Sequence, residues 1–301
     1  MRQKLIWRLQ AYACDLLSAF LRALGVDRAS ALGGAIVGRL GPMIKRHRVV
    51  HQNLRLAFPD MDPAERDRIA VAQWKNFGRY IAETFLLDRL TPASGRIEIV
   101  GGDRLQAIAK AGRPAVFISG HLSNMETMAA VILTMGVDCV IAGRSLNNPY
   151  IDARLREWRR SYGVKTFATK SASGAREQLA ALQQGKSVAH LVDQKNNQGM
   201  LAPFFGHPAP TQTSAAKMAL NNNAPLVPIS VQRLNGARFR VVVHEPLRIP
   251  STGRRQDDAE ACVREINAFV EARVREKPEE WWWMHRRWPK DLYQTLAAEP
   301  S

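Results

Sequence analysis

The stretch Ala115-Val-Phe-Ile-Ser-Gly-His-Leu-Ser-Asn-Met-Glu126 decides the fold that the sequence predicts. It runs from an apolar, β-branched segment through Gly120 into the beginning of a helical pattern, which is typical of a strand-to-helix turn in an α/β sheet. Loops after the carboxyl ends of strands are where α/β folds place their functional sites. The stretch therefore predicts the class of fold and also a candidate site at His121.

The same alternation continues on both sides of this stretch. Short β-branched runs at 97–100, 115–119, 139–142, 187–192, 226–232 and 239–244 read as strands. Helical patterns at 125–135, 151–162, 175–184 and 213–221 lie between them, and another follows at 257–275. Such alternation predicts an α/β fold with a mixed, mainly parallel central sheet flanked by helices.

The first 90 residues are expected to form a separate helical layer. Residues 1–24 are apolar, but Arg8, Asp15 and Arg22 interrupt them, which argues against a signal peptide and against a simple membrane span. Polar residues recur there at spacings of three, four and seven, so a helix would carry one narrow polar stripe on an otherwise apolar surface. That pattern favours a membrane interface, although packing on the protein's own core would also explain it. We expect amphipathic, membrane-associated helices in residues 1–90, including one over 63–90, and one α/β domain over 91–301, the two forming a continuous unit.

The charge of the chain points to anionic partners. There are 43 Lys and Arg residues against 27 Asp and Glu, a formal net charge of +16. Such a positive field attracts nucleic acid, anionic lipid or an acidic protein. No helix-turn-helix, zinc-finger or RNP pattern is present, so a basic nucleic-acid-binding protein is only the alternative from a different class. The three cysteines, Cys14, Cys139 and Cys262, are far apart and predict neither a disulfide framework nor a zinc site.

His121 and Glu126 are the candidate catalytic pair. Five residues apart on one continuous helix, they would point about 140° away from each other. If His121 instead lies in the turn before the helix and Glu126 in its first turn, the carboxylate can reach one imidazole nitrogen and leave the other free as a base. The alternative is a capping box, in which Ser123 and Glu126 have only a local structural role.

A resemblance strengthens the catalytic interpretation. The H-x4-E spacing of His121 and Glu126 is similar to the H-x4-D/E signature of glycerolipid-type acyltransferases. Further motifs occur in the matching order: Asn53-Leu54 with Phe58-Pro59, Arg144-Ser-Leu-Asn-Asn-Pro149, Asp193-Gln194, Phe204-Phe-Gly206 followed by Thr211, Pro228 with Arg233, and Trp281-Trp-Trp-Met-His-Arg-Arg-Trp288. Together they resemble the lipid A biosynthesis acyltransferases of Gram-negative bacteria, the lauroyl and myristoyl transferase family within the lysophospholipid acyltransferase superfamily.

One departure concerns the loop itself. The family often reads H-x-G-N-W-E, whereas this chain has Leu122, Ser123 and Met125 around the retained Asn124. The residues of the pair are kept, but the shape of the neighbouring pocket is expected to differ.

The resemblance implies a reaction and its participants. A fatty acyl chain would pass from an acyl carrier protein thioester to a hydroxyl of a lipid A precursor at the cytoplasmic face of the inner membrane. His121 would be the general base and Glu126 its partner, with the backbone amides after His121, or Arg144, binding the oxyanion. The implied substrate-binding residues are Arg144, Asn124, Asp193, Gln194, Phe205 and Thr211.

The expected partners are acyl carrier protein, a glycolipid acceptor and an anionic membrane surface, with no nucleic acid. No metal and no cofactor are expected, apart from acyl-acyl carrier protein or acyl-CoA as co-substrate, and without a G-x-S-x-G elbow direct transfer is expected. Another glycolipid or an aminolipid as acceptor, or acyl-CoA as donor, stays open as an alternative.

Two further groups of residues have two interpretations each. The arginines at 154, 156, 159 and 160 read most simply as a solvated helix face and otherwise as a docking site for an acidic carrier protein or lipid phosphates. Trp281, Trp283 and Trp288 either anchor at a lipid interface or lie buried in a core.

Overall fold

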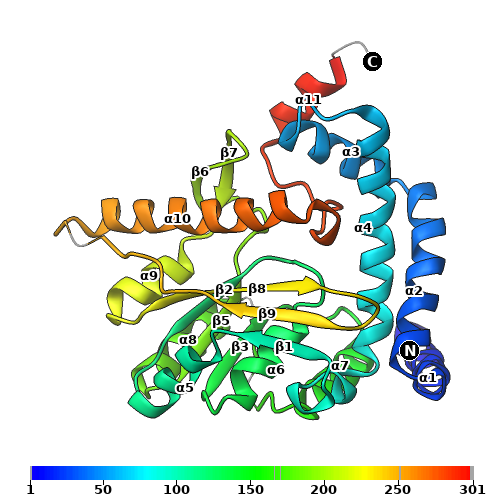
Figure 1. The fold of residues 1–301 in the computed structure, drawn as a ribbon, viewed down its shortest axis with the longest axis horizontal. Helices are drawn as coiled ribbons and strands as arrows, with labels where there is room; N and C mark the ends of the chain where they lie inside the picture. Colours follow the sequence, from blue (N-terminus) through cyan, green and yellow to red (C-terminus); the bar gives the residue numbers. More distant parts are fainter. Residues whose placement is uncertain (1, 166, 170, 251, 299–301) are drawn as a thin grey trace.

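A mixed sheet of seven strands forms the centre of the molecule (Figure 1). The computed structural model describes residues 2–165, 167–169, 171–250 and 252–298. The strand order is β1-β9-β8-β2-β5-β3-β4, and every neighbouring pair is parallel except β8 and β9. The strands are β1 (Ile97–Val100), β2 (Val116–Ser119), β3 (Cys139–Gly143), β4 (Phe167–Thr169), β5 (Ser187–Leu191), β8 (Leu226–Arg233) and β9 (Phe239–Val243).

Helices cover both faces of this sheet. Successive side chains of β2 alternate between two apolar cores: Val116 and Ile118 join one core, and Phe117 joins the other. The first core includes residues from α8 (Ala172–Gln183), α9 (Ser214–Asn221) and α10 (Arg255–Glu276). The second includes residues from α5 (Gly102–Ala111), α6 (Glu126–Thr134) and α7 (Pro149–Arg160). The predicted α/β class, with a mainly parallel sheet flanked by helices, is confirmed.

Four helices precede the sheet along the chain. They are α1 (Arg2–Leu24), α2 (Val26–Leu40), α3 (Arg46–Ala57) and α4 (Pro63–Thr84). Helices α2 and α4 run side by side at the edge of the molecule (Figure 1). Their contact depends on glycine, because a Cβ atom on Gly33 would lie 2.4 Å from the carbonyl oxygen of Gly78. Asp62 caps α4 by accepting hydrogen bonds from the amides of Ala64 and Glu65.

Several element boundaries differ from the expectation. The helix expected over 63–90 ends at Thr84. Some short or weakly patterned elements were not predicted. They are β4, α5, α11 (Lys290–Ala298) and the hairpin of β6 (Met200–Phe204) and β7 (His207–Thr211). The hairpin contains three prolines, which lowered its strand signal.

Helix α1 contacts the rest of the protein along one side, where Ala11 and Leu21 are buried and part of the polar stripe forms ion pairs. Asp15 forms an ion pair with Arg154, and Arg22 donates to Asp88 at 2.7 Å. The apolar residues on its other sides face solvent: the exposed fractions are 59% for Leu9, 74% for Leu16 and 52% for Phe20. Both interpretations therefore apply in part: one narrow side of α1, which includes Leu21, packs on the protein's own core, and most of its apolar side chains stay exposed.

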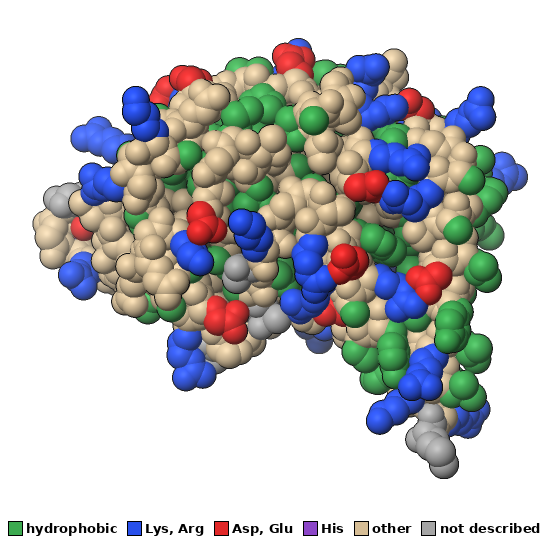
Figure 2. Space-filling model, turned by 90° about the horizontal axis from the view of Figure 1, so that it is seen from below, with side chains coloured by type: hydrophobic (Ala, Val, Ile, Leu, Met, Phe, Trp, Pro, Cys, Tyr) green, Lys and Arg blue, Asp and Glu red, His purple; other side chains and the backbone are tan. Residues whose placement is uncertain are grey.

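The apolar side of α1 is conspicuous at the surface. The helix projects from the body at the lower right of Figure 2, where hydrophobic side chains are interspersed with Lys and Arg. Among the described residues, no helix combines the length and the apolar character needed to cross a membrane.

Candidate active site

Three adjacent strands bring the predicted site residues together. Strand β5 lies between β2 and β3, and all three are parallel, so their carboxyl ends meet at one edge of the sheet. His121 follows β2, Asp193 and Gln194 follow β5, and Arg144 follows β3. Residues 72 positions apart in the sequence therefore become neighbours in space.

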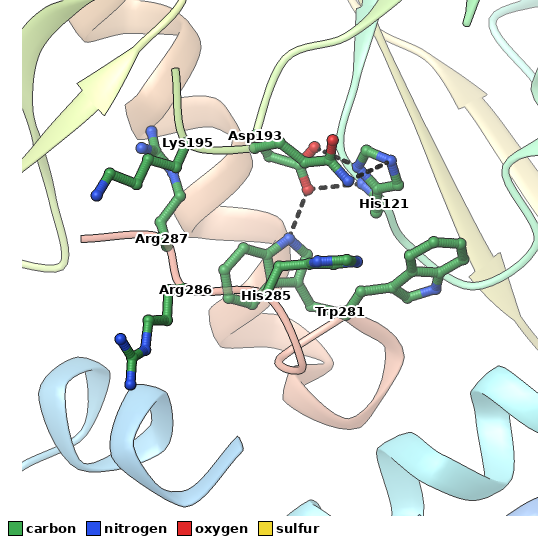
Figure 3. A pocket seen from close by; sticks show the side chains of 9 residues that line it. His121, Asp193, Lys195, Trp281, His285, Arg286 and Arg287 are labelled. Atoms are coloured by element: carbon green, nitrogen blue, oxygen red, sulfur yellow. Dashed lines mark hydrogen bonds and ion pairs between the residues drawn. The ribbon is translucent and has the colours of Figure 1, made fainter. Parts of the chain in front are cut away.

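Asp193 holds the imidazole of His121. Its Oδ1 lies 2.6 Å from Nδ1 of His121, and its Oδ2 accepts hydrogen bonds from the His121 amide at 2.7 Å and from Nε1 of Trp281 at 2.6 Å (Figure 3). Burial raises the pKa of the Asp193 carboxyl, but the His121 imidazole and these hydrogen bonds outweigh it and hold that pKa well below its ordinary value. Because an anionic carboxylate only accepts, Nδ1 carries the hydrogen in the neutral ring and Nε2 presents a lone pair. The Gln194 amide nitrogen lies 3.3 Å from that Nε2.

The expected contact between Glu126 and His121 is not the one that forms. Glu126 accepts two hydrogen bonds from Arg159, at 3.0 and 2.6 Å, and one from the Tyr162 hydroxyl at 2.6 Å. Burial raises the pKa of the Glu126 carboxyl, and the charge and hydrogen bonds of Arg159 more than compensate, so the net shift is downward. The anionic partner of His121 is thus Asp193, from the neighbouring strand, and Glu126 pairs with Arg159 from α7.

The local capping alternative also fails. The hydroxyl of Ser123 is buried and has no hydrogen-bond partner among the described residues, whereas the amide of Glu126 donates to the side-chain oxygen of Asn124 at 3.2 Å. Ser123 has a positive φ of 48°, a conformation that is uncommon for a residue with a side chain. The loop between β2 and α6, which contains His121 and Ser123, therefore depends on contacts with other segments of the chain to keep this conformation.

Two other segments supply those contacts. The amide of Ser123 donates to the carbonyl of Glu280 at 2.9 Å, and Leu122 pairs with Trp281 in an isolated antiparallel bridge. On the other side, Asn124 donates to Glu83 at 2.8 Å. Glu83 is completely buried in α4 and also accepts from Arg233 at 2.5 and 3.0 Å. The C-terminal tryptophan motif and helix α4 thus fix the loop that carries His121.

These contacts occupy the backbone amides that were expected to bind an oxyanion. The amide of His121 donates to Asp193, that of Leu122 to the Gly120 carbonyl at 2.8 Å, and that of Ser123 to Glu280. Of the amides after His121, the expectation is therefore wrong for those of Leu122 and Ser123. The alternative donor, Arg144, is exposed at the end of β3 and forms no ion pair with any residue in the described part of the chain.

His121 lies between two hollows. One is a small pocket of about 10 Å³, the size of a single water position, whose lining includes Asp193, Gln194 and Trp282. The other is a cavity of about 510 Å³. Its apolar lining includes Met125, Met128, Ala129, Ile141, Ala142, Leu146, Leu155, Phe167, Ala189 and Leu191. Its polar lining includes Glu126, Arg144, Arg159 and Gln194.

The remaining predicted residues lie behind this site. Asn124 and Thr211 are completely buried and Phe205 nearly so, and none of the three lines either hollow. Thr211 accepts a hydrogen bond from the buried Arg287 at 2.7 Å, and Phe205 packs edge-to-face against Phe58 with ring centroids 5.2 Å apart. Their observed contacts support the loops around the site.

Sequence reasoning missed Trp282 and His285, which line both hollows. The Trp282 ring packs against that of His121, with centroids 5.0 Å apart. Both residues belong to the 281–288 motif, so the motif pointed to the right segment without showing which side chains face the site. Trp281, Trp283 and Trp288 are buried, as the core interpretation expected.

The four arginines of α7 are all paired with carboxylates. Arg154 pairs with Asp15, Arg156 with Asp152, Arg159 with Glu126 and Arg160 with Glu157. They therefore hold α1 and the cavity wall in place, and their charges are compensated within the protein.

Comparison with known proteins identifies a family. The family model described as bacterial lipid A biosynthesis acyltransferase matches residues 6–290. The chain belongs to this family. The match covers almost all of the chain, including the N-terminal helices and the 281–288 motif, and confirms the resemblance seen in the motifs. The protein is a lipid A biosynthesis acyltransferase.

Individual relatives are distant but cover most of the chain. The acyltransferase is 26% identical over 253 residues to the lipid A biosynthesis lauroyltransferase of Escherichia coli (strain K12), covering 81% of this chain and 79% of that protein. It is 23% identical over 266 residues to the palmitoleoyltransferase of the same strain, covering 85% and 83%. A lipid A biosynthesis acyltransferase of Haemophilus influenzae is 23% identical over 277 residues, covering 86% and 83%.

Proposed function

We propose that the enzyme transfers a fatty acyl chain from an acyl carrier protein thioester to a hydroxyl of a lipid A precursor, with His121 as the general base. The observation that carries this proposal is the hydrogen bond between Asp193 and Nδ1 of His121. It leaves Nε2 with a lone pair next to a largely apolar cavity, where an acyl chain can lie.

The reaction follows from this arrangement. As the acceptor oxygen attacks the thioester carbon, its proton passes to Nε2 of His121, and the anionic Asp193 stabilises the imidazolium that forms. The C–O bond then forms fully as the C–S bond breaks. The proton on Nε2 goes to the departing thiolate, which returns the ring to its starting state. Asp193 acts through His121, so it is a positioning residue.

Two side chains are placed to assist at the cavity. Arg144 lines the cavity with its charge unpaired among the described residues, and it is our candidate for stabilising the oxyanion. The Gln194 amide lies within reach of Nε2, so the acceptor hydroxyl would take over its place next to His121. Glu126 holds Arg159 in the cavity wall and compensates its charge, while the Tyr162 hydroxyl donates to Glu126 from behind that wall.

A reconstituted assay tests the proposal. The purified enzyme is mixed with dodecanoyl- or tetradecanoyl-acyl carrier protein, or with the matching acyl-CoA, and with an acylated, bisphosphorylated glucosamine disaccharide in detergent. Mass spectrometry is expected to show one added acyl chain, formed faster from the carrier protein thioester. A faster reaction with acyl-CoA would contradict the proposed donor. No product with either donor, while a phospholipid or an aminolipid is acylated, would contradict the acceptor.

The surface of α1 suggests how the enzyme reaches its acceptor. A helix that packs along one narrow side and exposes Leu9, Leu16 and Phe20 fits an interfacial position in a bilayer, with the neighbouring Lys and Arg side chains at anionic headgroups. We propose that α1 lies on the cytoplasmic face of the inner membrane.

Three substitutions test this membrane contact. In the triple variant Leu9→Glu, Leu16→Glu, Phe20→Glu, partitioning onto vesicles of phosphatidylethanolamine and phosphatidylglycerol is expected to fall by about 10-fold or more, because burying each side chain contributes about 2 kcal/mol. Co-sedimentation measures it. The matched control replaces the exposed Leu179, Leu201 and Leu234, which lie outside the N-terminal helices, with Glu and is expected to partition far better than the α1 variant. Equal losses in the two triple variants would contradict the role of α1.

A further inference from the structure

We propose that the enzyme holds a phosphate group of its acceptor in a basic pocket outside the catalytic cavity, formed by Lys45, Arg48, Arg286 and Lys290. This inference rests on the proposed function, since it takes the acceptor to be a phosphorylated glycolipid. We call this site the basic pocket.

The basic pocket is a cavity of about 290 Å³ between helix α3, helix α11 and the loop that leads into α11. Four of its eight lining residues are cations, and none is an acid; the others are Val49, Gln52, Tyr293 and Gln294. Four positive charges around one hollow repel each other, and this cost persists unless an anion occupies the hollow.

These cations have no acidic partner in the part of the chain that the structure describes. Within the described residues, neither Lys45, Arg48, Arg286 nor Lys290 forms an ion pair with a carboxylate. The arginines of α7 show the opposite pattern, because each of them has an acidic partner. The charge of the basic pocket is therefore available to a ligand.

Arg286 is held in place by its neighbours. The Arg286 guanidinium lies 5.1 Å from the ring centroid of Tyr293, in a cation–π arrangement. The Tyr293 hydroxyl accepts from the Arg287 amide at 2.9 Å and donates to the side-chain oxygen of Asn53 at 2.5 Å. Asn53 in turn donates to the carbonyls of Trp283 and His285, at 2.6 and 2.8 Å. A buried network thus fixes the backbone on both sides of Arg286.

The same loop joins the basic pocket to the reaction site. Arg286 lines both the basic pocket and the small pocket beside His121. Its side chain extends away from His121, whereas His285, the preceding residue, lies close to it (Figure 3). A headgroup bound through its phosphate at Arg286 would therefore extend toward the base.

The basic pocket also adjoins an apolar surface. Met43 and Ile44 come directly before Lys45 and are 80% and 47% exposed. An apolar projection next to a cluster of cations suits the boundary of a bilayer, where acyl chains and charged headgroups meet. The ligand is thus expected to come from a membrane lipid.

The shape favours a phosphate group over an acidic protein. A carrier protein helix needs an extended contact surface, while the basic pocket is a hollow of the size that accepts a small group. Two arginines and two lysines provide the forked and point-charge donors that phosphate oxygens accept. Lys290 begins α11, so the amino terminus of that helix adds to the positive potential.

A vesicle assay tests the basic pocket apart from catalysis. The full-length protein is titrated with phosphatidylcholine vesicles containing an acylated, bisphosphorylated glucosamine disaccharide, or its enzymatically dephosphorylated form. The wild type is expected to bind the phosphorylated form about 10- to 100-fold more tightly. In the triple variant Arg48→Gln, Arg286→Gln, Lys290→Gln, this preference is expected to disappear. The double variant Lys217→Gln, Arg264→Gln, whose exposed cations lie on α9 and α10, is expected to keep it.

The other outcomes separate the alternatives. Equally tight binding to vesicles with phosphatidylglycerol would overturn the acceptor assignment, because the basic pocket would then bind any anionic lipid. If the triple variant keeps its preference for the phosphorylated disaccharide but loses binding to acyl carrier protein in solution, the hollow is a carrier site and the proposal fails. If the enzyme transfers no acyl chain in the reconstituted assay, the vesicle result still stands, so failure of the proposed function is distinguishable.

Kinetics give an independent readout. With the phosphorylated acceptor, the triple variant is expected to raise the KM for the acceptor by about 10- to 100-fold, with kcat changed much less, because the phosphate contacts are the same in the ground state and the transition state. An unchanged KM would contradict the proposal even if binding to vesicles were weaker.

Discussion

Replacing His121 with alanine is expected to lower kcat for acyl transfer by about 10²- to 10⁴-fold, because the attacking hydroxyl would lose the base that takes its proton. The residual rate would come from the cavity and from Arg144, which still place the thioester and the acceptor together. The KM for the acceptor is expected to change little, since the substitution leaves the residues of the basic pocket unchanged. A discontinuous assay of radioactive acyl transfer has the range to measure such a loss.

This variant needs a control that shows that the protein still folds. The ring of His121 packs against Trp282 and is bonded to Asp193, so its removal also affects stability. The alanine variant should still unfold cooperatively in urea and still partition onto vesicles through α1. His207→Ala, which removes a ring that hydrogen-bonds to the Leu56 carbonyl and packs against Trp288 away from both hollows, is the matched histidine substitution and is expected to keep nearly all activity. Turnover within a few fold of the wild type in His121→Ala would refute the base assignment.

The sequence predicted the architecture well because the sheet has strong local signals. Buried parallel strands such as β2 and β5 appear as short apolar, β-branched runs, and the segments between them are long enough for crossover helices. Elements without such a signal were missed. The proline-containing hairpin of β6 and β7 and the three-residue strand β4 depend on tertiary packing, which no local pattern records.

The site was predicted in part, for a comparable reason. His121 was found because a polar residue after a buried strand is visible in the sequence. Its partner was sought nearby, at Glu126, because local spacing is all that one sequence displays. The observed partner, Asp193, depends on the order of strands in the sheet, and spacing within the chain does not encode that β5 lies beside β2. Asp193 was predicted near the site, but without its role.

The strongest test of this revised pair is Asp193→Asn, for which kcat is expected to fall by about 10²- to 10⁴-fold with little change in KM. The geometry explains why an isosteric amide is so disruptive. Oδ2 of Asp193 accepts from two N–H groups, the His121 amide and the Trp281 indole, so the amide nitrogen of an asparagine cannot occupy that position. It must take the place of Oδ1 and donate to Nδ1 of His121. The imidazole hydrogen then moves to Nε2, and the base is lost.

Glu126→Gln provides the comparison, because it changes the carboxylate that the spacing had suggested. This variant leaves Arg159 buried with an uncompensated charge, so we expect unfolding in urea to show a loss of about 3 to 5 kcal/mol. A double-mutant cycle in unfolding free energy then separates the two carboxylates. His121→Ala and Asp193→Asn are expected to show a coupling of about 1 to 3 kcal/mol, since their side chains are bonded, whereas His121→Ala and Glu126→Gln should add within about 0.5 kcal/mol. The reverse pattern, with coupling between His121 and Glu126 and additivity between His121 and Asp193, would show that Glu126 is the partner of His121, as the local spacing suggested.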